Sequence, residues 1–152
     1  MLEVARYVLD ASVAAKWHLR DETFVSEAQQ VLDDFGEGRI RLIAPQIIQH
    51  EVSSAILKAT RHSDRPLRPT LEEGLAAIRL FLRYPLELFS TSELVYAGYQ
   101  VAGHLGCSYY DGLYLAAAEL TSTPYLYADD KLRRTLRERF PLAIWIEDYR
   151  HV

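Results

Sequence analysis

Four acidic residues, in four separate segments of the chain, are the strongest candidates for chemistry. Asp10 directly follows the apolar run YVL, and Asp129 directly follows YLYA. Glu51 and Asp111 each lie in a helical pattern, on the side that carries apolar residues. An ionised carboxylate next to a hydrophobic core is unfavourable unless it is paired, so each of these acids needs a partner.

A bound cation is one partner that all four acids could share. Carboxylates that converge on one region repel one another, and a divalent ion offsets that repulsion. Oxygen ligands without a matching set of His or Cys favour Mg²⁺ or Mn²⁺ over zinc. These ions activate water and neutralise charge on a phosphodiester. The acids therefore indicate metal-dependent phosphate chemistry.

A local structural role is the alternative for three of the acids. Asp10, Asp111 and Asp129 each precede a predicted helix, and Asp is among the best N-terminal caps, so any one of them alone is better explained as a cap. Glu51 is predicted in the middle of its helix, where no cap is needed. There it could instead reach water or pair with an arginine.

Short apolar strands must position these acids, and they alternate with helical patterns. Strands are predicted at residues 6–10, 41–44, 86–90, 125–128 and 142–146. This alternation predicts a mainly parallel sheet with helices on both faces. Ligands bind at the carboxyl edge of such sheets, which is where the first and fourth strands place Asp10 and Asp129.

Helical spacing occupies most of the remaining chain. Helices are predicted at residues 12–19, 22–38, 45–60, 70–84, 92–106, 110–121 and 130–140. Pro45 is expected at the first position of its helix and Gly106 at a helix end, while residues 61–69 read as a loop.

Composition sets the broad class of the protein. The 152 residues, 49% of them hydrophobic, are enough for one domain with no linker. Cys107 is the one cysteine, so no internal disulfide can form. Charged residues interrupt the N-terminus, and no apolar run approaches the ~20 residues that cross a bilayer, so we expect a soluble, cytoplasmic protein. The net charge of −4 argues against indiscriminate binding of polyanions.

Four segments occur in an order that matches a known family. They are YVLDASVAAKWHLRDE, APQIIQHEVSSAILKA, LGCSYYDGLYLAAAE and YLYADDKL, and they extend over nearly the whole chain. In this order they resemble the PIN-domain family, most closely the prokaryotic ribonuclease toxins of VapC type. The resemblance implies one nuclease domain over residues 1–152, a three-layer α/β/α sandwich with a five-stranded parallel sheet. It also implies a Mg²⁺- or Mn²⁺-dependent endoribonuclease.

The resemblance also assigns roles to individual residues. It implies that the catalytic, metal-binding acids are Asp10, Glu51, Asp111 and Asp129. The first three would hold a metal directly, while Asp129 would bind a second ion or orient the attacking water. Ser12 would support the first acid, although it could simply cap the first helix. Lys16 is expected near the catalytic edge, where it could position RNA.

The region of the fourth acid departs from the family pattern. Tyr127 stands where the family usually has Thr or Ser, two residues before the acid, and its phenol is much larger but can still donate a hydrogen bond. Asp130 adjoins Asp129 and could replace it as a ligand. Asp129 is favoured because it occupies the aspartate position of the family pattern.

Basic and aromatic residues add weaker signals. The last helix carries Lys131 and several arginines, which could position an RNA backbone but are better explained as a solvated helix face. The chain has ten tyrosines, and most are expected to fill the core or subunit interfaces.

The resemblance also implies partners for the protein, and two rival functions are open. The resemblance implies an RNA substrate, a homodimer, and a small antitoxin whose C-terminal segment covers the acidic groove. The first rival is a non-toxin or non-catalytic PIN domain that acts in RNA processing or binding. The second is a receiver or phosphatase domain, which would need a second acid near the first strand, where the chain reads DAS.

Overall fold

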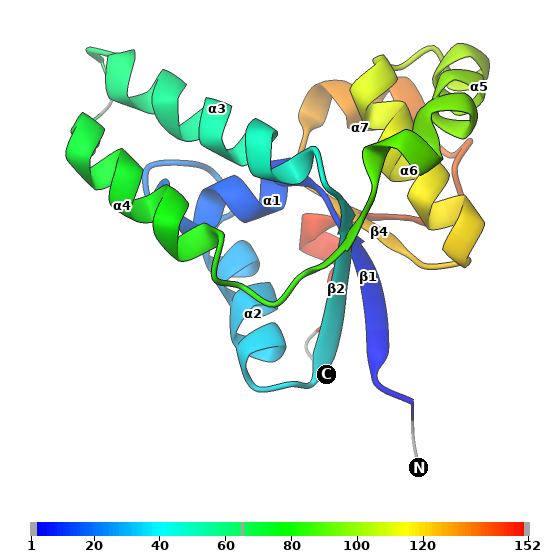
Figure 1. The fold of residues 1–152 in the computed structure, drawn as a ribbon, viewed down its shortest axis with the longest axis horizontal. Coiled ribbons are helices and arrows are strands. Elements are labelled where there is room, and N and C mark those ends of the chain that lie inside the picture. Colours follow the sequence, from blue (N-terminus) through cyan, green and yellow to red (C-terminus); the bar gives the residue numbers. More distant parts are fainter. Residues whose placement is uncertain (1–2, 65, 151–152) are drawn as a thin grey trace.

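A computed structural model describes residues 3–64 and 66–150 of the chain (Figure 1). The strands are β1 (Ala5–Leu9), β2 (Ile40–Pro45), β3 (Glu87–Phe89), β4 (Tyr125–Tyr127) and β5 (Ala143–Trp145). They form one sheet in the order β3-β2-β1-β4-β5, and every neighbouring pair is parallel. The prediction of a five-stranded parallel sheet is confirmed.

Seven α-helices connect the strands over the part of the chain that the structure describes. They are α1 (Ala11–Ala14), α2 (Val25–Gly36), α3 (Ile48–Arg61), α4 (Leu71–Phe81), α5 (Val95–Leu105), α6 (Tyr109–Thr121) and α7 (Asp130–Leu136). All seven expected helices are present. The first is shorter than predicted and continues as a 3₁₀ helix, Ala15–Trp17. The last ends early, because Arg137 has a left-handed φ of 50°.

Two helix boundaries test the sequence signals directly. Pro45 was expected to begin α3 but ends β2 instead, and the chain continues alongside β3 through a hydrogen bond from Gln46 N to Phe89 O of 2.8 Å. A proline is tolerated at a strand end because the N–H that it lacks is not needed there. Gly106 ends α5 as predicted, with a left-handed φ of 73°.

The layers place the acids at one edge of the sheet. Helices α2 and α6 lie on opposite sides of β1 and β2, and α5 packs outside α6 (Figure 1). The chain adds β2 and β3 on one side of β1 and then adds β4 and β5 on the other. Ligands bind in such α/β sheets where the strand order reverses, outside the carboxyl ends of the strands. That place lies between the ends of β1 and β4.

Helix α6 is the central helix of the core. Its residues from Gly112 to Ala118 are all buried, which is typical of a helix that is covered on every side. Gly112 meets Gly98 of α5, where the two helix backbones approach closely. This contact lies directly after Asp111, which is in the first turn of α6.

The described residues contain no helix with both the length and the apolar character that crossing a bilayer requires.

Candidate active site

A cavity of about 370 Å³ at the carboxyl edge of the sheet is lined by all four predicted acids. Ser12 and Lys16 line the same cavity, and so do Lys58 of α3 and Glu22. The acids come from the ends of β1 and β4 and from the first turns of α3 and α6. Folding thus collects every predicted site residue in one place.

Asp10 is the most constrained of the acids, with only 6% of its surface exposed. Its Oδ1 accepts a hydrogen bond of 2.7 Å from the Tyr125 hydroxyl. Its Oδ2 accepts hydrogen bonds from the Ser12 N–H, at 3.0 Å, and from the Ser12 hydroxyl. Ser12 Oγ in turn accepts from Ala128 N at 2.9 Å, so this serine joins Asp10 to the end of β4.

Tyr125 is a site residue that sequence reasoning missed. It lies in β4, is fully buried, and contacts an acid 115 residues away. The register of the sheet creates the contact, because Tyr125 pairs with Val8 two residues before Asp10. The only signal in the sequence was a polar hydroxyl in an apolar strand that precedes Asp129.

Glu51 lies in the first turn of α3 and not in the middle of the helix, because Pro45 belongs to the strand and α3 begins at Ile48. Its carboxylate is half-buried. Tyr114 of α6 is buried nearby, and its hydroxyl faces the Glu51 carboxylate. Burial raises the pKa of this phenol well above its ordinary value, and the charges of Asp10 and Glu51 raise it further.

The structure shows which of the acids cap a helix. Asp10 caps α1 through the Ser12 N–H, and Asp129 caps α7 by accepting from Leu132 N at 2.9 Å. Both therefore have a local role and also line the cavity. For Asp111 the cap interpretation is wrong, because Ser108 caps α6 by accepting from Asp111 N at 3.0 Å. The Asp111 carboxylate lines the cavity, and its hydrogen bonds with Ser108 lower its pKa in opposition to burial.

Burial and mutual repulsion disfavour the charged acids. Burial, and to a smaller extent Glu51, raises the pKa of Asp10 from 3.8 to about 7, although its hydrogen bonds act in the opposite direction. Burial also raises the pKa of Glu51, and the charges of Asp111 and Asp129 add to this effect. Burial raises the pKa of Asp111, and the charge of Asp129 raises it further. A positive charge in the cavity would relieve this repulsion.

Comparison with known proteins identifies the fold family. The family model described as the PIN domain matches residues 7–137. This chain belongs to the PIN-domain family. The crystal structure of PAE2754 from Pyrobaculum aerophilum is similar in fold, with a TM-score of 0.64 and 17% sequence identity over 95% of this chain and 85% of that one. No match was found among curated proteins.

PIN domains are typically nucleases and generally use divalent metals. In this PIN domain, no group of three or more His, Cys, Asp or Glu side chains among residues 3–64 and 66–150 is arranged to hold a metal ion. The four acids share a cavity without forming a ready-made coordination shell. Their oxygen donors are nevertheless of the type that Mg²⁺ and Mn²⁺ prefer.

We expect the metal-free PIN domain to lose stability as the pH rises from about 4 to 7. Asp10 keeps its proton in the folded chain up to a pKa of about 7 but releases it near 3.8 when unfolded, so the folded state binds more protons across this range. The difference between the two pKa values corresponds to at most about 4 kcal/mol in the free energy of unfolding. Urea unfolding in EDTA at pH 4 and pH 8 measures most of it. The Asp10→Asn variant should show a flatter pH dependence, and an equal slope would contradict the assignment.

The predicted RNA-positioning residue Lys16 is buried at the cavity wall. Its Nζ lies 3.6 Å from a Glu22 carboxylate oxygen, so part of its charge is compensated within the chain. Lys58, two turns after Glu51 on α3, is a second cation at the same cavity.

Tyr127 and Asp130 line a different hollow from the cavity that the four acids line. The ring of Tyr127 stacks on Tyr125 at 5.3 Å and meets Trp145 edge to face, so the larger phenol is accommodated by packing. Tyr127, Asp130 and Arg133 line a separate hollow of about 750 Å³. Asp129 and Asp130 therefore face different hollows, and Asp129 is the one that faces the other acids.

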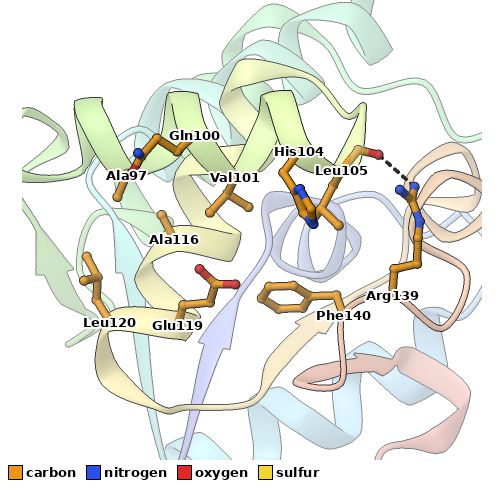
Figure 2. Close-up of a pocket in the computed structure, with 10 residues that line it drawn as sticks. All are labelled: Ala97, Gln100, Val101, His104, Leu105, Ala116, Glu119, Leu120, Arg139 and Phe140. Carbon is orange, nitrogen blue, oxygen red and sulfur yellow. Dashed lines mark hydrogen bonds between the residues drawn. The ribbon is translucent and has the colours of Figure 1, made fainter.

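A further cavity of about 460 Å³ lies between α5, α6 and the segment after α7 (Figure 2). Glu119 and Phe140 point into it from below and His104 from α5 above. Arg139 at its end donates to the Leu105 carbonyl oxygen at 2.8 Å. Glu119 supplies the one carboxylate in this cavity, among other polar and apolar side chains. The cavity therefore lacks the cluster of acids found at the carboxyl edge of the sheet.

Proposed function

We propose that this PIN domain is a Mg²⁺- or Mn²⁺-dependent endoribonuclease whose catalytic, metal-binding acids are Asp10, Glu51, Asp111 and Asp129. One observation carries the proposal. Four acids from four separate segments line a single cavity, at the edge where the strand order reverses. Three of them carry a pKa that burial and mutual repulsion raise, and a cation in the cavity would relieve that repulsion.

The neighbours of the acids fit this use. When bound, a divalent cation supplies an activated water and neutralises charge on the phosphodiester. Ser12 and Tyr125 hold the Asp10 carboxylate in one orientation. Asp129 uses Oδ1 to cap α7, which leaves Oδ2 to orient the attacking water. The water oxygen bonds to phosphorus as the bond to the 3′-oxygen breaks, so the products carry a 5′-phosphate and a 3′-hydroxyl.

Cleavage of total RNA tests the proposal. Wild-type protein with Mn²⁺ or Mg²⁺ should cut RNA and leave 5′-phosphate ends, and EDTA should stop the reaction. Metal binding should also stabilise the folded chain, by about 2.7 kcal/mol when the free ion is at 100 times its Kd. Thermal melting with and without Mn²⁺ measures this. The absence of any shift at millimolar Mn²⁺ would argue against a metal site.

Tyr125→Phe is expected to weaken Mn²⁺ binding by roughly 10- to 100-fold, the range found when a partner that orients a metal ligand is removed. The change deletes one hydroxyl that donates to Asp10 and keeps the ring in the core. Calorimetric titration with Mn²⁺ measures the affinity.

Tyr149→Phe is the matched control for Tyr125→Phe. It also deletes a buried hydroxyl that donates to a carboxylate, in this case Asp34 at 2.6 Å. Asp34 lies outside the acid cavity, so the control should cost stability without changing Mn²⁺ affinity. Equal affinities for all three proteins would show that Tyr125 does not orient Asp10 for the metal.

The proposal extends to the role of a VapC-type toxin in the cytoplasm, acting as a homodimer and neutralised by a small antitoxin. Exposed apolar side chains at Leu71 and Leu75 of α4 and at Leu82, which directly follows the helix, support a protein partner, because soluble monomers rarely expose large apolar patches. Expression of the wild-type chain should arrest growth, whereas Asp111→Asn should not. Growth should recover when a short neighbouring gene is expressed with it, and unaffected growth would contradict the toxin role.

A further inference from the structure

The cavity between α5, α6 and the segment after α7 is separate from the proposed active site. The two cavities share no lining residue. The volume of this cavity, about 460 Å³, lies within the range of roughly 300–1,000 Å³ that is typical of small-molecule pockets. Its walls come from three separate segments of the chain, which a bound molecule would contact together (Figure 2). It is therefore large enough for a ligand that has no part in RNA cleavage.

Glu119 brings a negative charge to this cavity, and no cation of the described chain neutralises it. Its side chain points into the cavity from α6 (Figure 2). Among residues 3–64 and 66–150 it makes no ion pair within 4 Å. A positively charged ligand would gain a charge-assisted hydrogen bond from this carboxylate without displacing an existing partner.

Arg139 is the arginine of the lining, and backbone carbonyl groups hold it at one end of the cavity. Its Nη2 donates to the Leu105 carbonyl oxygen at 2.8 Å and to the Thr135 carbonyl oxygen at 2.6 Å. Figure 2 shows the guanidinium at the Leu105 end, away from the side where Leu120 lies. The two carbonyl oxygens partly offset its charge, so Arg139 leaves the Glu119 carboxylate to a ligand.

The other end of the cavity is apolar. Ala97, Ala116 and Leu120 gather there (Figure 2). Leu120 is 66% exposed, so a ligand would remove apolar surface from water by covering it. Phe140 points into the same cavity, and the face of an aromatic ring attracts cations. The lining thus combines one carboxylate with apolar and aromatic surface.

We propose that this cavity binds a small organic cation, in which an ammonium group pairs with Glu119 and an apolar body covers Leu120. The inference does not depend on the proposed nuclease activity. A small anion would be repelled by Glu119, and a wholly apolar ligand would remove water from the carboxylate without replacing its hydrogen bonds. A bare Mg²⁺ or Ca²⁺ ion needs several oxygen ligands, and this cavity offers one carboxylate.

Titration with phenethylamine tests the inference, because this probe carries an ammonium group on a phenyl body. Amide chemical shifts of the isotope-labelled wild-type chain are followed in EDTA at pH 7. Saturable shifts should centre on α5, on the second half of α6 and on residues 139–140. The neutral alcohol 2-phenylethanol should bind more weakly than the amine. The anion 3-phenylpropionate should bind most weakly of the three.

Three variants separate the charge from the apolar contact. Glu119→Gln should weaken phenethylamine binding roughly two- to fivefold, the effect of losing an exposed ion pair, and should leave 2-phenylethanol binding unchanged. Leu120→Ser should weaken the binding of both probes. Glu72→Gln is the matched control, since Glu72 is exposed on α4 outside the cavity, and it should bind both probes like wild type. All three replaced side chains are exposed, so each variant should fold.

Four results would overturn the inference. Equal phenethylamine affinity for wild type and Glu119→Gln would remove the ion pair. Tighter binding of 3-phenylpropionate than of the amine would make Arg139 the anchor. Shifts centred on Asp10 and Asp111 would show that the four acids attract the amine instead. The absence of saturable shifts at millimolar amine would show that the cavity takes no such ligand. RNA cleavage is measured separately, so each of these results leaves the nuclease assignment unchanged.

Discussion

Asp111→Asn is expected to fold like the wild-type chain and to lose RNA cleavage by more than about 100-fold, because even residues that only support metal ligands contribute roughly 10- to 100-fold. The substitution keeps the size of the side chain. Helix α6 keeps its cap as well, because the cap is the Ser108 hydroxyl bonded to the backbone N–H of residue 111. Cleavage of a defined RNA with Mn²⁺, followed on gels, measures the loss.

Asp130→Asn is the matched control for this prediction. It removes one carboxylate from an adjoining hollow and leaves the four acids in place. Its cleavage rate should stay near that of wild type, and both variants should melt within a few degrees of it. Full activity in Asp111→Asn would remove this acid from the proposed mechanism, and strong loss in Asp130→Asn would mean that the fourth acid was assigned to the wrong neighbour.

Gly112→Ala is expected to destabilise the fold by at least about 3 kcal/mol, the upper part of the usual range for overpacked cores. A Cβ at this position would overlap with the Gly98 carbonyl oxygen and would lie 2.8 Å from the Ala102 Cβ. Backbone atoms of a neighbouring helix cannot rotate away, so α5 and α6 would have to separate. The melting temperature should fall by roughly 6–12 °C.

Gly103→Ala provides the control within the same pair of helices. A Cβ at Gly103 meets no atom within 4 Å. This substitution should stabilise α5 by about 0.5–1 kcal/mol, because alanine loses less backbone entropy than glycine in a helix. If both variants melted at the wild-type temperature, the close contact of α5 and α6 would be wrong. Because Asp111 precedes Gly112, the same contact holds an acid at the cavity.

The sequence by itself determined the fold class and the order of its parts. Apolar runs of strand length alternate with helical spacing, and these patterns are local, so all five strands and seven helices were placed before any contact was known. The positions of Asp10 and Asp129 after strands followed from the same patterns. Parallel strands end at a common edge, which is why these two acids could be expected near one another.

Only the tertiary structure decided the contacts around the acids. The bond from Tyr125 to Asp10 depends on β4 lying beside β1, and no local pattern encodes which strands are neighbours. The choice of Ser108 as the cap of α6 depends on where that helix begins, and the sequence pattern alone offered Asp111 for the same role. Local sequence fixes which residues can take part in a site, whereas strand order and helix packing fix which of them meet.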